Sequence, residues 1–358
     1  MIYSELIRQK ESRTGLDADV IGSLIDTSVS SVSIARIEDG AIVFSAAFGS
    51  QSCGRAATPA TLYNIASMTK PISAEVVLRL ASSGSISLDE PMHPYWIDPD
   101  ITKDDRHKLL TPRIALSHQT GFPNWRAETG GVLAFKGTPG LVYAYSGEGY
   151  EYLARFVEKR MGASFEDLAQ SLVLGPAGMQ DTSYTKRRWF CGRVAFPTNC
   201  RGISFLPVFA QKLVASHLMY TTTTDYAKFM LSVMNSVGVS GAFATERSTV
   251  QLNQKACAST LPQAKGSICE SGYGLGWEIM KFRDRTLLWH TGRDYGVFAI
   301  GYFSPSNRAG TIIFTNSANG ARVVRPVMEG LAEDPAFIDC LLARARIDRG
   351  CAKQYSTS

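Results

Sequence analysis

The sequence contains no long hydrophobic run. No part of its 358 residues approaches the roughly 20 apolar residues that a helix needs to span a bilayer. Residues 1–10 also carry no apolar core of the length found in signal peptides. We therefore expect a cytoplasmic protein, or a periplasmic or secreted one if this chain is a processed form.

Cysteine and histidine are sparse. Seven cysteines, none in a Cys-x-x-Cys pair, are too few for a disulfide scaffold. Two pairs have a spacing that could close a loop in an oxidising compartment: Cys191 with Cys200, and Cys257 with Cys269. The simpler expectation is that these cysteines are buried or unreactive thiols. The five histidines show no spacing typical of a metal site, so we expect no metal and no other cofactor.

The sequence also has only a small excess of positive over negative charge. The net charge is only +5, with 19% charged and 45% hydrophobic residues, which is typical of a packed globular protein. The densest basic run, Lys186-Arg187-Arg188, is best interpreted as a solvated loop. The composition therefore gives no support to nucleic-acid binding and leaves small molecules as the expected partners.

Segments typical of β-strands lie at both ends of the chain. Residues 31–37 and 41–47 flank Asp39-Gly40, a dipeptide that favours a hairpin turn. Three further strands are expected near the other end, at residues 286–289, 297–303 and 310–315, with a turn at 304–307. These segments predict one sheet assembled from both ends of the chain.

Helical spacing dominates the middle of the sequence. It predicts helices at residues 150–161, 164–173 and 224–236, and a later one at 323–331. We predict an α+β fold in which residues 1–66 and 271–350 form the sheet region. Residues 67–270 are expected to form a mostly helical region of the same catalytic domain.

The most informative motif is Ser67-Met68-Thr69-Lys70. It opens a predicted helix from Ser67 to about Ala81, so the serine and the lysine share one helix face. A serine at a helix start lies beside backbone amides and the positive end of the helix dipole. A lysine kept dry beside it can lose its proton and act as a base, which is how a serine nucleophile is activated.

A second match, Ser183-Tyr184-Thr185-Lys186, has no apolar period behind it. Roughly one or two such matches arise by chance in a chain of this length. We therefore expect Ser67, and not Ser183, to be the reactive serine.

Two further stretches accompany Ser67 in order along the chain. The first contains Tyr145-Ser146-Gly147 and the second contains His290-Thr291-Gly292-Arg293. With these motifs the sequence resembles the serine β-lactamase-like hydrolases, which include class C β-lactamases, D-alanyl-D-alanine carboxypeptidases, D-aminopeptidases and related carboxylesterases. The segment 116–123, the segment 175–182 and Tyr273-Gly274-Leu275-Gly276-Trp277 are similar to further landmarks of that family.

The resemblance implies a fold and a set of roles. The fold would be an antiparallel sheet flanked by terminal helices, with the site where the helical region meets it. Ser67 would be acylated, Lys70 would take its proton, and Tyr145 would share that proton and pass it to the leaving group. His290 would orient Tyr145 or attract a substrate carboxylate.

The same resemblance implies an oxyanion hole. The backbone N–H groups of Ser67 and Arg293 would form it, with Thr291 and Gly292 beside them. The Arg293 side chain would bind a substrate carboxylate or pair with Asp294, two alternatives that the sequence leaves open.

Gly147 departs from the family's usual Tyr-x-Asn motif. That asparagine normally holds the lysine and an amide carbonyl of the substrate, and glycine can do neither, although Glu148 could substitute in part. Some aromatic residues near the motifs would line an acyl pocket or pack in the core: Trp125, Tyr143, Tyr220, Trp277 and Tyr295.

These features favour a serine acyl hydrolase of the carboxylesterase type. The alternative within the family is a class C-type β-lactamase or a D-amino-acid peptidase or carboxypeptidase. Two alternatives of another kind are a biosynthetic acyltransferase and a protein that captures acyl groups or penicillins without turnover. The oligomeric state is not predicted.

Overall fold

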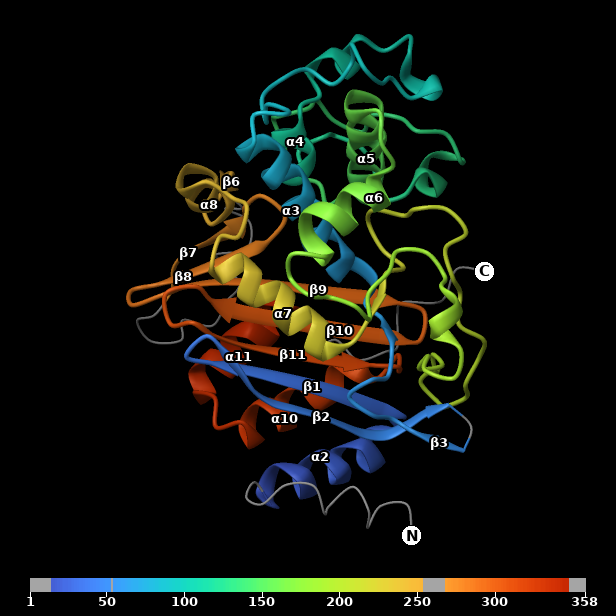
Figure 1. Ribbon diagram of the computed structural model, residues 1–358, viewed down its shortest axis with the longest axis vertical. Helices are drawn as coiled ribbons and strands as arrows, with labels where there is room; N and C mark the ends of the chain where they lie inside the picture. Colours follow the sequence, from blue (N-terminus) through green and yellow to red (C-terminus); the bar gives the residue numbers. More distant parts are fainter. Residues whose placement is uncertain (1–13, 53, 254–267, 348–358) are drawn as a thin grey trace.

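The two ends of the sequence meet in one antiparallel sheet, which crosses the middle of the computed structural model (Figure 1). The structure describes residues 14–52, 54–253 and 268–347. Within them the strand order is β3-β2-β1-β11-β10-β9-β8-β7-β6. These strands are β1 (Ser31–Glu38), β2 (Ala41–Ser52), β3 (Arg55–Ala56), β6 (Leu252–Asn253), β7 (Ile268–Tyr273), β8 (Glu278–Phe282), β9 (Thr286–Asp294), β10 (Val297–Ser304) and β11 (Ala309–Thr315). Because β11 pairs with β1, the expected α+β fold with a sheet built from both ends is confirmed.

The predicted hairpin at Asp39-Gly40 joins β1 to β2. Both residues have positive φ, +50° and +76°, as a tight two-residue turn between antiparallel strands requires. The strands extend beyond their predicted limits, since β2 continues to Ser52 and β9 runs on to Asp294. The longer β9 matters for function because its added residues, 290–294, carry the third motif.

Most of the helices lie in the chain between β3 and β6, and three more come from its two ends. They are α2 (Thr14–Thr27), α3 (Thr69–Ser82), α4 (Pro112–Leu116), α5 (Gly147–Met161), α6 (Phe165–Ala169), α7 (Thr223–Met234), α8 (Gly241–Arg247), α10 (Val324–Gly330) and α11 (Pro335–Arg344). Short 3₁₀ turns are η2 (Ala66–Met68), η3 (Pro99–Ile101), η4 (Asp105–Leu109), η5 (Arg126–Thr129), η7 (Arg188–Phe190) and η8 (Gly320–Val323). The predicted helix at 164–173 divides into α6 and a π-helical turn, Gln170–Leu174.

Each face of the sheet has its own hydrophobic core. On one face, Ile34, Trp289 and Ile300 pack with residues of α2, α10 and α11. On the other, Ala35 and Phe314 join the core that contains α3, α5 and α7. Figure 1 shows α7 lying along the sheet and α4, α5 and α6 stacked above it. No helix in the described ranges is long and apolar enough to cross a membrane.

Candidate active site

Ser67 lies in a sharp turn between a short strand and α3. The strand β4 (Tyr63–Asn64) pairs with β5 (Tyr220–Thr221), and η2 follows it directly. Ala66 adopts φ +44°, which is rare for a residue other than glycine, and its N–H donates to Asn64 Oδ1 at 2.8 Å. The turn leaves Ser67 partly exposed at the start of a helix whose next residues are buried.

Lys70 is completely buried directly beneath Ser67. Its Nζ donates to Ser67 Oγ at 3.1 Å and to the Ser216 carbonyl at 2.9 Å. Burial lowers the pKa of Lys70 to about 7, although the charge of Glu151 opposes this effect. Near neutral pH much of the enzyme therefore holds Lys70 as a free amine, the state in which it can accept the proton of Ser67.

Glu151 is a site residue that sequence reasoning missed. Its carboxylate accepts hydrogen bonds from the Ala215 N–H (3.2 Å), the Ser216 N–H (3.0 Å) and Ser216 Oγ (2.6 Å). It thereby holds the segment whose carbonyl binds Lys70. Its only sequence signal is an acidic residue between Tyr150 and Tyr152 on the helix that follows Tyr145, which is too weak to single it out.

Tyr145 approaches the same pair from the other side. Its hydroxyl hydrogen-bonds with Ser67, and Lys70 Nζ lies 4.8 Å from its ring centroid. Burial raises the pKa of Tyr145, so the phenol stays protonated and can relay a proton. The next residue, Ser146, is fixed by His118, whose Nδ1 accepts its N–H at 3.1 Å and whose ring lies 4.2 Å from that of Tyr145.

His290 lies close to the other groups but in its neutral form. Burial, helped by the charge of Lys70, lowers its pKa to about 3. Its Nδ1 lies 2.7 Å from the Thr291 carbonyl, which can only accept, so Nδ1 carries the proton. Its Nε2 therefore accepts from the Tyr273 hydroxyl at 3.1 Å, while the Tyr145 ring lies 6.3 Å away. The structure thus gives His290 no positive charge to attract a substrate carboxylate, and the side chain to which it hydrogen-bonds is that of Tyr273.

The edge of β9 beside Ser67 carries the second expected oxyanion donor. A two-residue turn joins β9 to β10 at the hydrogen-bonded pair Asp294–Val297. Because the pattern alternates, the backbone groups of Asp294 and Gly292 bond to β10. The N–H of Arg293, which lies between them, therefore points to the other edge of β9, where β8 pairs only as far as Trp289. The lack of a side chain at Gly292 allows this edge to lie against the turn, since a Cβ there would clash with the Ile65 carbonyl.

The Arg293 side chain lies elsewhere. Its Nη2 donates to the Ala345 carbonyl at 3.1 Å and its guanidinium stacks over Phe298. Asp294, in turn, bonds to Asn64 and to the Tyr295 N–H. Both Phe298 and Ala345 belong to the core on the opposite face of the sheet, so these contacts direct the Arg293 side chain toward that core.

The position of the missing asparagine is occupied by a tryptophan. A Cβ at Gly147 would come within 2.6 Å of the Trp125 indole. That indole in turn contacts the ring of His217, with centroids 4.7 Å apart. Glu148 does not fill the gap, because its carboxylate binds the Arg126 backbone N–H at 3.0 Å and its guanidinium at 2.8 Å.

Of the other aromatic residues, Trp277 and Tyr220 are buried core residues. Tyr143 lies against His118 and Tyr273, behind the site. Tyr295 is 51% exposed on the turn between β9 and β10, where it contacts Phe205. Trp125 lies directly against Gly147 of the second motif.

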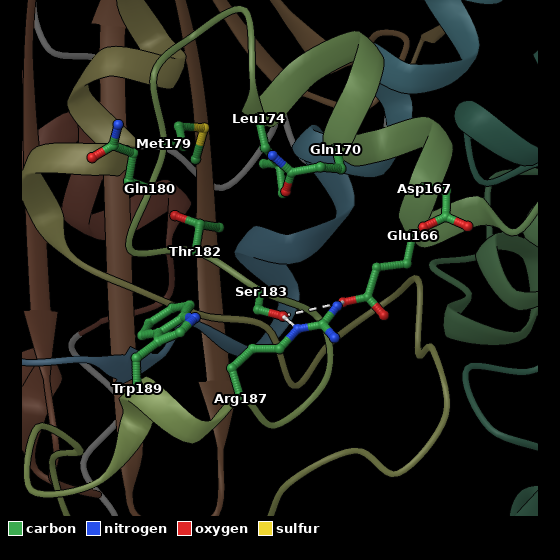
Figure 2. A pocket seen from close by; sticks show the side chains of 10 residues that line it. All are labelled: Glu166, Asp167, Gln170, Leu174, Met179, Gln180, Thr182, Ser183, Arg187 and Trp189. Carbon is green, nitrogen blue, oxygen red and sulfur yellow. Dashed lines mark hydrogen bonds and ion pairs between the residues drawn. The ribbon is translucent and has the colours of Figure 1, made fainter.

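The second Ser-x-x-Lys match is structural. Figure 2 shows Ser183, Glu166 and Arg187 turned toward one another. Ser183 Oγ donates to the Thr185 carbonyl at 2.8 Å and accepts from Arg187 Nε at 3.0 Å. Lys186 lies over the Phe209 ring instead of contacting Ser183, so this motif lacks the serine–lysine contact that Ser67 and Lys70 make.

The cysteines correct one expectation. Cys200 is disulfide-bonded, whereas Cys191 is a free, exposed thiol, so these two residues do not close a loop together. Cys340 is a free, buried thiol. The expected pairing of Cys257 with Cys269 involves a residue outside the described ranges.

Comparison with known proteins gives a consistent result. The Beta-lactamase family model matches residues 16–329. Protein flp of Staphylococcus aureus (strain COL) is 21% identical over 332 residues, a match that covers 86% of this chain and 63% of that protein. This chain therefore spans less than two thirds of that relative's length.

Solved structures share the fold. The octameric penicillin-binding protein homologue from Pyrococcus abyssi superposes with a TM-score of 0.75 at 21% identity, covering 94% of this chain and 81% of that one. The D-amino acid amidase from Ochrobactrum anthropi SV3 gives a TM-score of 0.68 at 20% identity, covering 88% and 98%.

Proposed function

Because the chain belongs to the β-lactamase family of serine hydrolases, we propose that it is a carboxylesterase-type acyl hydrolase working through an acyl-enzyme on Ser67. One observation carries this proposal. Position 147 has no side chain, and the Trp125 indole lies where an asparagine would extend. A site without that amide has no group there to bind the acylamide carbonyl of a penicillin or a peptide, whereas a simple ester does not need one.

The geometry supports a proton-relay mechanism. The neutral amine of Lys70 accepts the proton of Ser67 Oγ as the oxygen attacks the ester carbonyl. The N–H groups of Ser67 and Arg293 stabilise the resulting oxyanion. Tyr145 relays the proton from Lys70 to the departing alcohol as the C–O bond breaks, leaving the acyl-serine. Water then attacks this ester, gives its proton back through the same relay, and releases the acid and free Ser67.

The surroundings of the relay favour short acyl groups. Trp125 lies against Gly147, near Tyr145, and His217 follows Ser216, whose carbonyl binds Lys70, so the two contacting rings form an aromatic wall beside the relay. Burial lowers the pKa of His217 to about 4, so this wall is uncharged at neutral pH. A neutral aromatic wall suits an uncharged acyl chain.

The test compares p-nitrophenyl butyrate with a chromogenic cephalosporin and follows both mixtures by intact mass spectrometry. We expect ester turnover, and a slow or trapped cephalosporin adduct on Ser67. Ser67→Ala should abolish turnover and labelling, while Ser183→Ala, its matched control, should leave both near wild type.

Each rival function gives a different outcome. Rapid cephalosporin turnover would move the assignment to β-lactamase, and release of D-alanine from a D-alanyl-D-alanine peptide would move it to a D-peptidase. Ester turnover that accelerates only with a particular alcohol or amine would indicate an acyltransferase. Stoichiometric labelling without turnover would indicate a capture protein.

A further inference from the structure

A groove with a volume of about 760 Å³ lies apart from Ser67. It is bounded by the β2–β3 end, the turn η7 and the loop of residues 194–209. Neither Ser67, Lys70 nor Tyr145 is among the described residues that line it. Its size lies in the range of about 300–1,000 Å³ that is typical of small-molecule sites.

The floor of the groove is apolar. Phe190 and Val194 are buried and belong to a small third core with Tyr220. Phe209 packs on this core, 5.8 Å from Phe190 between ring centroids. At the rim, Leu206 is 78% exposed, an unusual position for a large apolar side chain.

The walls of the groove are cationic. Arg55, Lys186, Arg187 and Arg188 line it, and none of the described lining residues is acidic. Glu166 pairs with Arg187, at 2.8 Å, and both residues also line a neighbouring pocket (Figure 2). Lys186 lies 4.9 Å from the centroid of the Phe209 ring, directly above the apolar floor, and Arg188 is exposed beside it.

We propose that this groove binds a single-chain fatty acid, with its carboxylate on Lys186 and Arg188 and its alkyl chain on Phe190 and Phe209. Cations with no acidic neighbour favour an anion, and guanidinium groups suit a carboxylate. An apolar floor of this size favours an alkyl tail over a small polar anion. The basic run 186–188 then serves as a ligand-binding element. The site is separate from Ser67 and does not depend on the proposed hydrolase activity.

The groove contains its own reporter. Cys191 is a free, exposed thiol among the lining residues, whereas Cys340 is buried. The experiment measures the rate at which the non-reduced protein is alkylated by iodoacetamide at Cys191, read by peptide mass spectrometry, with increasing decanoate below its micelle concentration. We expect saturable protection of about tenfold, because the bound chain covers the thiol. Butyrate and decylamine should protect little, since the first lacks the tail and the second the negative charge.

Variants distinguish a built site from general adsorption. Lys186→Glu and Arg188→Glu should each raise the decanoate concentration that gives half-maximal protection by about tenfold or more. This change corresponds to the loss of one charged hydrogen bond. Lys212→Glu removes an exposed cation of the same part of the chain that does not line the groove, and should have no effect. Rates are compared as ratios with and without decanoate, because a nearby charge also changes the reactivity of the thiol.

Ser67→Ala should retain full protection, which separates this site from the acyl-enzyme. Absence of protection by decanoate, equal protection by decylamine, or full protection in both charge-reversed variants would overturn the proposal. Circular dichroism of each variant excludes unfolding as the cause of lost protection.

Discussion

At the scale of single residues, the reactivity that we propose for Ser67 depends on a carboxylate that binds neither Ser67 nor Lys70 directly. Glu151 holds the Ala215 and Ser216 backbone, and the Ser216 carbonyl holds Lys70. Its negative charge also raises the pKa of Lys70 against the larger effect of burial. We therefore propose that Glu151 is a positioning residue, which fixes the location of the proposed base Lys70 and partly offsets the effect of burial on its pKa.

Replacing Glu151 with glutamine removes the charge and keeps the shape. The pKa of Lys70 should fall below its value of about 7, because the opposing charge is gone. In the proposed mechanism activity requires the neutral amine in the free enzyme, so kcat/KM should rise as pH rises through this pKa. We expect the acid limb of the kcat/KM profile to move to lower pH by about half a unit to one unit.

Glu148→Gln is the matched control for this experiment. Glu148 lies on the same helix, but its carboxylate binds Arg126 and is not a cause of the shift at Lys70. Its substitution should leave the position of the acid limb unchanged. If Glu151→Gln lowers the rate without moving the limb, Glu151 acts on the loop alone and its electrostatic role is wrong.

At the scale of elements, β9 contributes to both the sheet and the site. Its residues up to Trp289 pair with β8, while residues 290–294 continue past β8 and face the Ser67 turn. The close approach of the two depends on Gly292, since a side chain there would meet the Ile65 carbonyl. The proposed oxyanion hole therefore depends on how closely this strand approaches the turn.

Gly292→Ala should separate these two elements. The added methyl group forces the β9 edge away from the turn, which misplaces the Arg293 N–H. Loss of one oxyanion donor costs about 10²–10³ in kcat, and we expect a fall of this size with little change in KM. Gly241→Ala, in open space at the start of α8, is the control and should keep wild-type kcat. A Gly292→Ala enzyme of normal kcat would show that the hole lies elsewhere.

Elements with local signals were predictable from the sequence. Asp39-Gly40 located the first hairpin because its turn demands positive φ, which these residues tolerate. The terminal helices that the resemblance implies are present as α2 and α11, although the sequence analysis gives them no bounds. A local signal does exist for α11, because Asp334 caps the Phe337 N–H and Pro335 begins the helix. The break between α6 and the π-helical turn has no comparable signal in residues 164–173.

The contacts around the site were less predictable than its motifs. Ser67 and Lys70 are neighbours on one helix, so their contact follows from spacing alone. Trp125, Glu151 and Tyr273 come from separate segments, and only the tertiary fold brings them to Gly147, Ser216 and His290. Such partners carry no local signature.

At the scale of the whole molecule, the site lies where the helical region meets the sheet, with a hydrophobic core on each face. This arrangement makes Lys70 a fully buried amine, which favours catalysis but opposes folding. The unfolded chain exposes Lys70 to water, where its pKa is close to 10.5, and the folded chain lowers it to about 7. Between these values the unfolded chain binds a proton that the folded chain does not, so the stability of the wild type rises with pH.

Lys70→Met removes this dependence and keeps a side chain of similar length. We expect the variant to gain stability relative to the wild type at pH 7, apart from a constant cost for the lost bond to the Ser216 carbonyl. The difference in free energy of unfolding, variant minus wild type, should then decrease by roughly 2 kcal/mol between pH 7 and pH 9. It decreases because the wild type becomes more stable as the pH rises toward the unfolded-state pKa of Lys70. Urea unfolding of both proteins at the two pH values measures the difference.

Lys228→Met, on the surface of α7, is the control. It should change the free energy of unfolding by the same amount at both pH values. A Lys70→Met difference that does not change with pH would mean that Lys70 titrates alike in the folded and unfolded chains, and that burial does not generate the base that activates Ser67.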